Sequence, residues 1–457
     1  MTDDGGASPQ GGTHDGPTLR EVANRCCKRI DVGAAVLPRP LFDADYDDAC
    51  GRGEAKIAGA TIEPASGDAA AECPLPDPSA SGPNTTRYAR TLSSEFNSVV
   101  IEHHLKWAPL CHSEPGPLED LRPSERVGRY DFHHCDRMVD WALERGMRVK
   151  GHVLCWHVTT PSFVDKMSPG EVREQLRRHI FTTVGHFRGR IHMWDVVNES
   201  LAPDGSLADS VFLRKLGPSY IEDCFRWAHE ADPGATLIYN DNKVEGMGGA
   251  NAVKSDGFYR LLKDLKDRGV PVHGAGLQGH FSAGGTGRGR CPTPSMVRNQ
   301  IRRLGQLGLK VNLSELDVRI SKLPPDSDLR RSAQVAIYRD LVAAALAEPA
   351  FDGIWLWGFT DRHTWVRHFY YEDEPLILDG NYRRKPCYYG LREALGTLGP
   401  GGTVGGELGP FLESDRDADG TSWGSLWMQP EPEPEAGPKI EADSAGDSRP
   451  DWEQGRE

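Results

Sequence analysis

Two glutamates stand at the ends of apolar segments that lie far apart in the sequence. Glu199 ends the segment WDVVNE at 194–199, and Glu315 lies in VNLSELD at 311–317. Two carboxyl groups that share a pocket can cleave a glycosidic bond. One protonates the leaving oxygen, and the other attacks the anomeric carbon when the two are about 5 to 5.5 Å apart. With Glu315 ionised, its charge should keep Glu199 protonated until the glycosyl-enzyme forms, after which Glu199 would act as a base.

Short apolar, β-prone segments alternate with longer amphipathic ones, which predicts repeated βα units. Eight strands are expected, at 29–36, 95–101, 147–153, 191–197, 236–240, 272–278, 310–315 and 352–357. Helices are expected between most of them, at 135–145, 169–187, 219–231, 256–267, 293–307 and 329–347. Eight such strands close a (β/α)8 TIM barrel, an α/β fold. The fourth and seventh strands would then present both glutamates to one pocket at the C-terminal face.

Low-complexity sequence frames the patterned region. We expect a disordered segment at 1–17, a catalytic barrel at 18–398 and a disordered, acidic, Pro/Gly-rich tail at 399–457. Between the first and second strands, 50–84 is rich in Ala, Gly, Pro and Ser, which indicates a surface insertion. Cys50 and Cys73 within it are possible disulfide partners.

Charge and hydropathy exclude some classes of partner. The formal net charge is −14, and 401–457 holds 14 acidic and 4 basic side chains, so the barrel is nearly balanced. We see no basic stripe for nucleic acid and no run of about 18 apolar residues to span a membrane. His133 and His134, near Cys135 and Asp136, resemble a metal cluster, but consecutive histidines point in different directions, so we expect no metal. The chemistry above needs no cofactor, and we expect a monomer.

The strand-end segments resemble those of family 10 glycoside hydrolases, the endo-β-1,4-xylanases. WDVVNE at 194–199 and SELD at 314–317 look like the two signature segments of that family. Similar matches are FNSV at 96–99 with Glu102 and Lys106, Gly151-His152 with Trp156, GLQGH at 276–280, Trp357-Gly358 with Trp365, and the closing segment from Pro375 to Pro386. The resemblance covers about 19–395, interrupted by the insertion, with the motifs in family order.

The resemblance implies a retaining endo-xylanase with Glu199 as general acid/base and Glu315 as nucleophile. Asn198 would bind the sugar 2-hydroxyl, while His280 would contact Glu315 and be oriented by Asp317. Other sugar hydroxyls would be bound by Glu102, Lys106, His152 and Gln278, with Gln278 near the nucleophile. Trp156, Trp357 and Trp365 would form an aromatic cage around the sugar. A substrate of this class predicts an extracellular protein, yet residues 1–17 show no signal peptide, so the location stays unknown.

One departure from the family pattern concerns the substrate. The family usually has Glu-Asn-Glu-Met-Lys where this chain has Glu102-His103-His104-Leu105-Lys106, so His103 replaces an asparagine at a sugar-binding position. Two alternatives therefore stay open: the same mechanism on another β-glycan or in transglycosylation, and a carbohydrate-binding pseudoenzyme. The intact pair of glutamates argues against the latter.

The spacing of two tryptophans on the eighth predicted strand bears on which of them faces the pocket. Trp355 and Trp357 lie two apart, so a regular strand places both on one face. We predict a break at the strand end that turns Trp357 toward the pocket, and we expect Trp194 to pack in the core.

Overall fold

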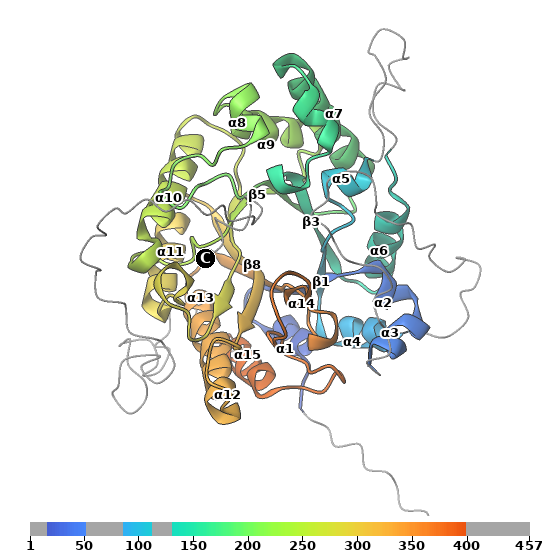
Figure 1. Cartoon of the computed structure of the whole chain (residues 1–457), viewed down its shortest axis with the longest axis vertical. Coiled ribbons are helices and arrows are strands. Elements are labelled where there is room, and N and C mark those ends of the chain that lie inside the picture. Colours follow the sequence, from blue (N-terminus) through green and yellow to red (C-terminus); the bar gives the residue numbers. More distant parts are fainter. Residues whose placement is uncertain (1–15, 52–85, 112–129, 399–457) are drawn as a thin grey trace, which may run out of the picture.

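The computed structural model describes residues 16–51, 86–111 and 130–398. Eight parallel strands pair in the order β6-β5-β4-β3-β2-β1-β9-β8, and β6 pairs with β8 to close the barrel (Figure 1). The strands are β1 (Asp31–Val36), β2 (Ser98–Ile101), β3 (Arg148–Cys155), β4 (Met193–Asn198), β5 (Thr236–Asp241), β6 (Gly274–Leu277), β8 (Lys310–Arg319) and β9 (Phe351–Leu356). The predicted (β/α)8 fold is confirmed. Nearly all of the segments 1–17, 50–84 and 399–457 lies outside the described residues, so the domain boundaries stay a prediction.

Helices surround the strands, as the view along the barrel shows (Figure 1). They are α1 (Leu19–Arg25), α2 (Pro38–Phe42), α3 (Ala44–Gly51), α4 (Arg87–Glu95), α5 (Trp107–Leu110), α6 (His133–Glu144), α7 (Pro169–His186), α8 (Val211–Leu216), α9 (Tyr220–Ala231), α10 (Ala252–Asp267), α11 (Pro294–Gly305), α12 (Ser327–Ala336), α13 (Val342–Leu346), α14 (Val366–Phe369) and α15 (Pro386–Gly396). Capping residues in the sequence mark the starts of several of these helices. Ser168 and Glu171, for example, form a capping box at α7. None of the described helices combines the length and the apolar character that a membrane crossing requires.

The structure adds two details to the predicted elements. The single helix expected at 329–347 is divided by a π-helical turn, η6 (Ile337–Leu341), between α12 and α13. A short strand, β7 (His280–Ser282), pairs with the end of β8 and was not predicted. With three residues, β7 is too short to show a hydrophobic period.

Small residues on β1 make room for a large ring inside the barrel. A Cβ atom at Gly33 would lie 2.3 Å from Trp355, so glycine is required there. Trp355 is fully buried, and its indole nitrogen donates to Ser98 Oγ at 3.1 Å. β9 ends at Leu356, so Trp357 lies just beyond the regular strand, and it belongs with Trp355 to the same buried interior cluster. Both tryptophans therefore point into the barrel, and Trp357, two positions later in the chain, lies nearer its C-terminal end. Trp194 packs in the outer core, as predicted.

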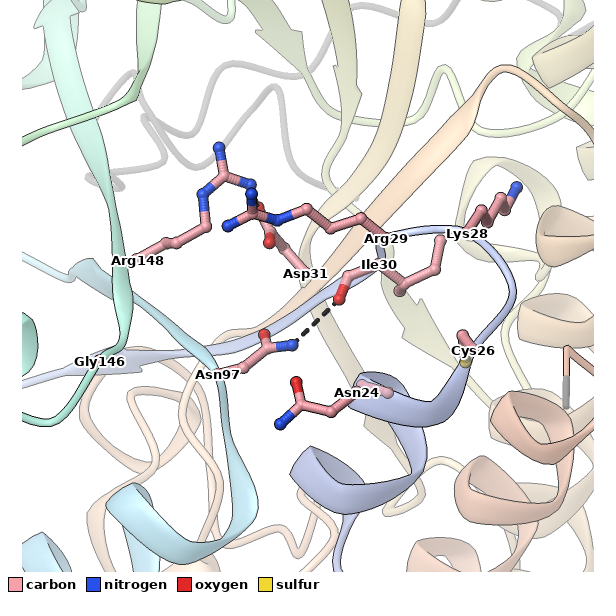
Figure 2. A pocket seen from close by; sticks show the side chains of 10 residues that line it. Asn24, Cys26, Lys28, Arg29, Ile30, Asp31, Asn97, Gly146 and Arg148 are labelled. Atoms are coloured by element: carbon pink, nitrogen blue, oxygen red, sulfur yellow. Dashed lines mark hydrogen bonds and ion pairs between the residues drawn. The ribbon is translucent and has the colours of Figure 1, made fainter. Parts of the chain in front are cut away.

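The N-terminal end of the barrel holds a cavity of about 310 Å³ (Figure 2). Arg148 forms an ion pair with the buried carboxylate of Asp31, and Asn97 Nδ2 donates to Ile30 O at 3.0 Å. These residues precede or begin their strands. In barrel enzymes, this end serves stability while the opposite end serves catalysis.

Candidate active site

Glu199 follows the last residue of β4 in a backbone conformation that few residues adopt. Its φ is 52°, in the left-handed region, and its amide donates to Asn240 O at 3.0 Å. Gln278 Nε2 donates to one carboxylate oxygen at 2.7 Å, and Trp156 Nε1 donates to the other at 3.1 Å. The carboxyl group is therefore fixed at both oxygens by neutral donors.

Glu315 lies within β8 and is 5% exposed. Asn240 Nδ2 donates to its Oε1 at 2.7 Å, and His280 Nε2 lies 3.2 Å from its Oε2. Its backbone amide donates to Gln278 O at 2.8 Å. A carboxylate held this way can turn little, so its orientation is set before a substrate arrives.

Asn198 connects the two glutamates through a single oxygen. Its Oδ1 accepts from Asn240 Nδ2 at 2.9 Å and from Gln278 Nε2 at 3.3 Å. Asn240 also binds Glu315, and Gln278 also binds Glu199. Because Oδ1 already accepts two bonds, Nδ2 of Asn198 is the atom suited to contact a sugar hydroxyl.

Asn240 was missed by sequence reasoning, although it touches both Asn198 and Glu315. It is fully buried at the end of β5, and its Oδ1 accepts from Ser314 Oγ at 2.6 Å. Gly276 lies opposite it on β6, where a Cβ atom would approach Asn240 Oδ1 to 2.2 Å. The signal that could have found it is Asn-Asp at the end of an apolar strand, the same pattern that singled out Glu199.

Gln278 differs in part from what the resemblance implied. Its main chain contacts the nucleophile candidate, since its carbonyl accepts from Glu315 N. Its side chain instead binds Glu199 and Asn198. Gln278 thus bridges the two sides of the pair.

His280 lies between two carboxylates. Its Nδ1 is 2.9 Å from Asp317 Oδ2, which also accepts from Trp365 Nε1 at 2.8 Å. Burial lowers the pKa of His280, but the charges and hydrogen bonds of Asp317 and Glu315 outweigh burial and raise it to about 10. The imidazolium therefore carries a positive charge at neutral pH and favours an ionised Glu315.

Glu102 and Lys106 follow β2, on the side of the barrel opposite β6. Burial raises the pKa of Glu102 to about 7, with Lys106 lowering it and Glu315 raising it. The buried Lys106 ammonium lies 4.8 Å from the ring centroid of Trp156 and 5.9 Å from that of Trp357. These charged and aromatic groups can meet both the hydroxyls and the C–H faces of a sugar.

His152 is positioned by a buried carboxylate that sequence reasoning did not single out. Its Nδ1 lies 3.0 Å from Asp195 Oδ2, and Lys150 Nζ approaches the same oxygen at 2.9 Å. Burial raises the pKa of Asp195, but Lys150 and His152 outweigh burial and hold it below its ordinary value. The His152 ring lies edge-on to Trp357, with centroids 5.0 Å apart.

The cage tryptophans surround this network from three elements. Trp156 follows β3, Trp357 follows β9, and Trp365 precedes α14. Trp365 lies 4.9 Å from His280, and Trp357 lies 6.4 Å from it, between ring centroids. His103, the departure from the family pattern, is exposed, and its ring lies edge-on to His104 at 5.8 Å.

Residues 77–394 match the sequence profile of glycosyl hydrolase family 10. A β-1,4-xylanase of Dictyoglomus thermophilum is 35% identical over 322 residues, 67% of this chain and 84% of that protein. Endo-1,4-β-xylanase B of Thermotoga neapolitana is 34% identical over 316 residues, 68% and 84% of the two chains.

Solved structures agree. Xylanase 10B of Thermotoga petrophila, determined in complex with xylobiose, has a TM-score of 0.66 and 32% identity, and the match covers 84% of this chain and 98% of that one. Among residues 16–51, 86–111 and 130–398, no group of three His, Cys, Asp or Glu side chains could hold a metal ion. With its closed parallel barrel and its matched segment of more than 300 residues, the chain belongs to glycosyl hydrolase family 10.

Proposed function

We propose that this protein hydrolyses internal β-1,4-xylosidic linkages of xylan with retention of anomeric configuration. The observation that carries the proposal is the pair Glu199 and Glu315, each fixed at both oxygens within one hydrogen-bonded network. Its relatives in Dictyoglomus and Thermotoga bear the name xylanase. The Thermotoga petrophila enzyme was solved with xylobiose, a product-sized fragment of this polymer.

In the first step, Glu315 attacks the anomeric carbon while Glu199 gives its proton to the departing glycosidic oxygen. The bond from carbon to that oxygen breaks, and an ester to Glu315 forms. Glu315 then carries no charge, so the repulsion that favours a protonated Glu199 disappears. Gln278 and Trp156 both donate to Glu199, which favours the ionised base needed next.

In the second step, Glu199 takes a proton from water, and the resulting hydroxide displaces Glu315 from the anomeric carbon. Two inversions give net retention. His280 stabilises the returning Glu315 carboxylate, because it is cationic and lies 3.2 Å from it. Asn198 Nδ2 would donate to the sugar 2-hydroxyl, a contact that strengthens as charge develops on the ring. The aromatic cage holds the sugar face, with the ring of Trp357 6% exposed.

Soluble β-1,4-xylan provides the direct test. Reducing-end release should be rapid with the wild type, and NMR of the first products should show the β-anomer before mutarotation. Glu315→Gln should lower turnover by at least about 10⁴-fold. α-Anomeric first products would contradict retention, and wild-type turnover in Glu315→Gln would contradict the role of that residue.

The exposed His103 supports a second candidate, the same chemistry on a different β-glycan or as a transglycosylase. A bulkier, titratable ring at a sugar-binding position could admit a different chain. Initial rates on xylan, mixed-linkage glucan and cellulose separate the two candidates, and a preference for a glucan would overturn the xylan proposal. Binding to xylan without any release of reducing ends would instead indicate a pseudoenzyme.

A further inference from the structure

A buried carboxylate lies behind the strand that carries Asn240. Asp241 is the last residue of β5 and is fully buried. Neighbouring residues of a strand point to opposite faces, so Asn240 faces the interior of the barrel and Asp241 faces the surrounding helices. Tyr239 shares the face of Asp241, and its ring packs against Phe258 of α10 at 5.4 Å between centroids. Asp241 therefore lies outside the pocket, and it can affect the reaction only through other residues.

The side chain of Asp241 holds the turn that follows Glu199. Its Oδ2 accepts from the amide of Leu201 at 3.3 Å and from Tyr239 Oη at 3.0 Å. The hydroxyl oxygen of Ser200 lies 2.6 Å from Tyr239 Oη. Because the tyrosine proton is directed at Asp241, the Ser200 hydroxyl is the donor of this bond. Both residues after Glu199 are thus tied to one carboxylate, Leu201 directly and Ser200 through Tyr239.

The main chain of Asp241 reaches Glu199 by a second route. Its carbonyl oxygen accepts from the amide of Gln278 at 3.1 Å, and the side chain of Gln278 donates to Glu199. Glu199 has a φ of 52°, a conformation that costs energy in a residue other than glycine and persists only where its surroundings enforce it. The bonds that tie the next two residues to Asp241 help to enforce it.

Lys254 places a cation beside Asp241. It lies in the first turn of α10 and is 5% exposed, and its Nζ is 2.9 Å from Asp241 Oδ1. Burial raises the pKa of Asp241, Lys254 lowers it, and the charge of Glu199 raises it. The influence between two carboxyl groups is mutual, so an ionised Asp241 makes Glu199 harder to ionise.

Other charged groups surround these two carboxyl groups. They are Glu315 on β8 and, in the segment after β5, Lys243 and Glu245. Burial lowers the pKa of Lys243 to about 8, with the charges of Lys254 and Arg319 acting in the same direction. A titration with a midpoint well below pH 8 therefore belongs to a carboxyl group and not to Lys243.

We propose that Asp241 is a positioning residue for Glu199: it fixes the turn that carries Glu199, and its negative charge favours the protonated form that the first step of the reaction requires. Lys254 moderates that charge from α10, and it favours the ionised form of Asp241 in a buried place. The inference rests on the proposed function, in which Glu199 is the general acid.

The pH dependence of kcat/KM on soluble xylan tests the charge. Its alkaline limb reports the loss of the proton from Glu199 in the free enzyme. Asp241→Asn removes a negative charge and leaves Lys254 uncompensated. Both changes lower the pKa of Glu199, so the limb should move to lower pH by about one unit. Asp241→Asn combined with Lys254→Met removes both charges, so its limb should lie between those of Asp241→Asn and the wild type. The midpoint of a limb does not depend on how much of a preparation is folded.

Two rate comparisons separate this role from a purely structural one. In Asp241→Asn, kcat/KM on xylan at the wild-type optimum should fall about tenfold. An aryl xylobioside with a dinitrophenolate leaving group needs no proton from Glu199, so it should lose far less. Tyr239→Phe keeps both charges but cuts the link to Ser200, so kcat/KM on xylan should fall about fivefold with the limb in place.

Asp267→Asn is the matched control. Asp267 is the last residue of α10, pairs with Lys263 and has a side chain that is 62% exposed, so its loss should move neither the limb nor the rate. An unmoved limb in Asp241→Asn would overturn the role of its charge. A double variant whose limb stays at that of Asp241→Asn would overturn the part of Lys254. A fall of the same size on xylan and on the aryl substrate would show that Asp241 serves only the fold. A wild type without activity on xylan would instead overturn the proposed function itself.

Discussion

Each end of the barrel holds a carboxyl group in a hydrogen-bonded network, but Asp31 at the N-terminal end and Glu199 at the C-terminal end have different partners. At the N-terminal end, Asp31 is paired with the cation Arg148 (Figure 2). His192 lies 3.4 Å from the same carboxylate. At the C-terminal end, the neutral side chains of Gln278 and Trp156 donate to Glu199. A buried charge with an opposite charge beside it is costly to leave alone, whereas a carboxyl group held by neutral donors can lose and regain a proton, as an acid/base must.

Of the variants that test this difference between the two ends, Glu199→Gln should have the largest effect on activity. We expect kcat/KM on xylan to fall about 10³-fold, because the leaving oxygen loses its acid. An aryl xylobioside with a dinitrophenolate leaving group needs no protonation, so its first step should persist and give a burst of phenolate. Equal losses on xylan and on the aryl substrate would contradict the role of Glu199 as acid.

Asn240→Ala should have the next largest effect. It removes the donor to Glu315 Oε1 and one of the two donors to Asn198, so we expect kcat/KM to fall about 10²-fold. It also leaves buried polar groups unsatisfied, so the free energy of unfolding should fall by about 1 to 3 kcal/mol. Steady-state kinetics beside thermal unfolding will separate the two effects. Asn24→Ala, an exposed asparagine at the N-terminal end, is the control and should leave both quantities unchanged.

Arg148→Met, at the N-terminal end, should lower stability without lowering activity. The Asp31 side chain is 4% exposed and would lose its cation, so the free energy of unfolding should fall by about 2 kcal/mol. Arg148 itself is 31% exposed, which keeps the loss moderate. Urea unfolding measures it, and kcat on xylan should stay at the wild-type value. A large fall in kcat would show that the two ends are coupled.

The smallest effect concerns Asp352, at the start of β9. Burial and the neighbouring Asp31 raise its pKa to about 6, from 3.8. The folded state therefore binds the proton more tightly than the unfolded chain, and ionisation above pH 6 costs stability that is regained as the pH falls toward 4. Asp352→Asn should raise the unfolding free energy by about 1 kcal/mol at pH 7.5 and by almost nothing at pH 4. A gain of the same size at both pH values would contradict this linkage.

Sequence reasoning located the barrel because strand ends carry strong signals. All eight predicted strands overlap observed ones, and six of them begin and end within two residues of the prediction: β1, β3, β4, β5, β6 and β9. The strands were recognisable because each apolar run ends at polar residues, and in a barrel enzyme such residues lie on the active-site face.

Other features lay beyond the reach of sequence patterns. Asn240 looked like an ordinary strand end, because its importance depends on its distance to Asn198 and Glu315, which come from other strands. Local periodicity reports burial, but it does not report which polar groups meet.

Gly276 has a consequence for protein engineering. Replacing glycine by alanine in regular structure is a common route to thermostable variants, because it restricts the unfolded chain. Gly276 would look suitable, since it lies in β6 without a positive φ. The side-chain amide oxygen of Asn240, however, occupies the space where a Cβ atom at position 276 would lie. A stabilisation campaign that screened on melting temperature alone could thus retain a variant whose nucleophile has lost its alignment, so such screens should spare this position.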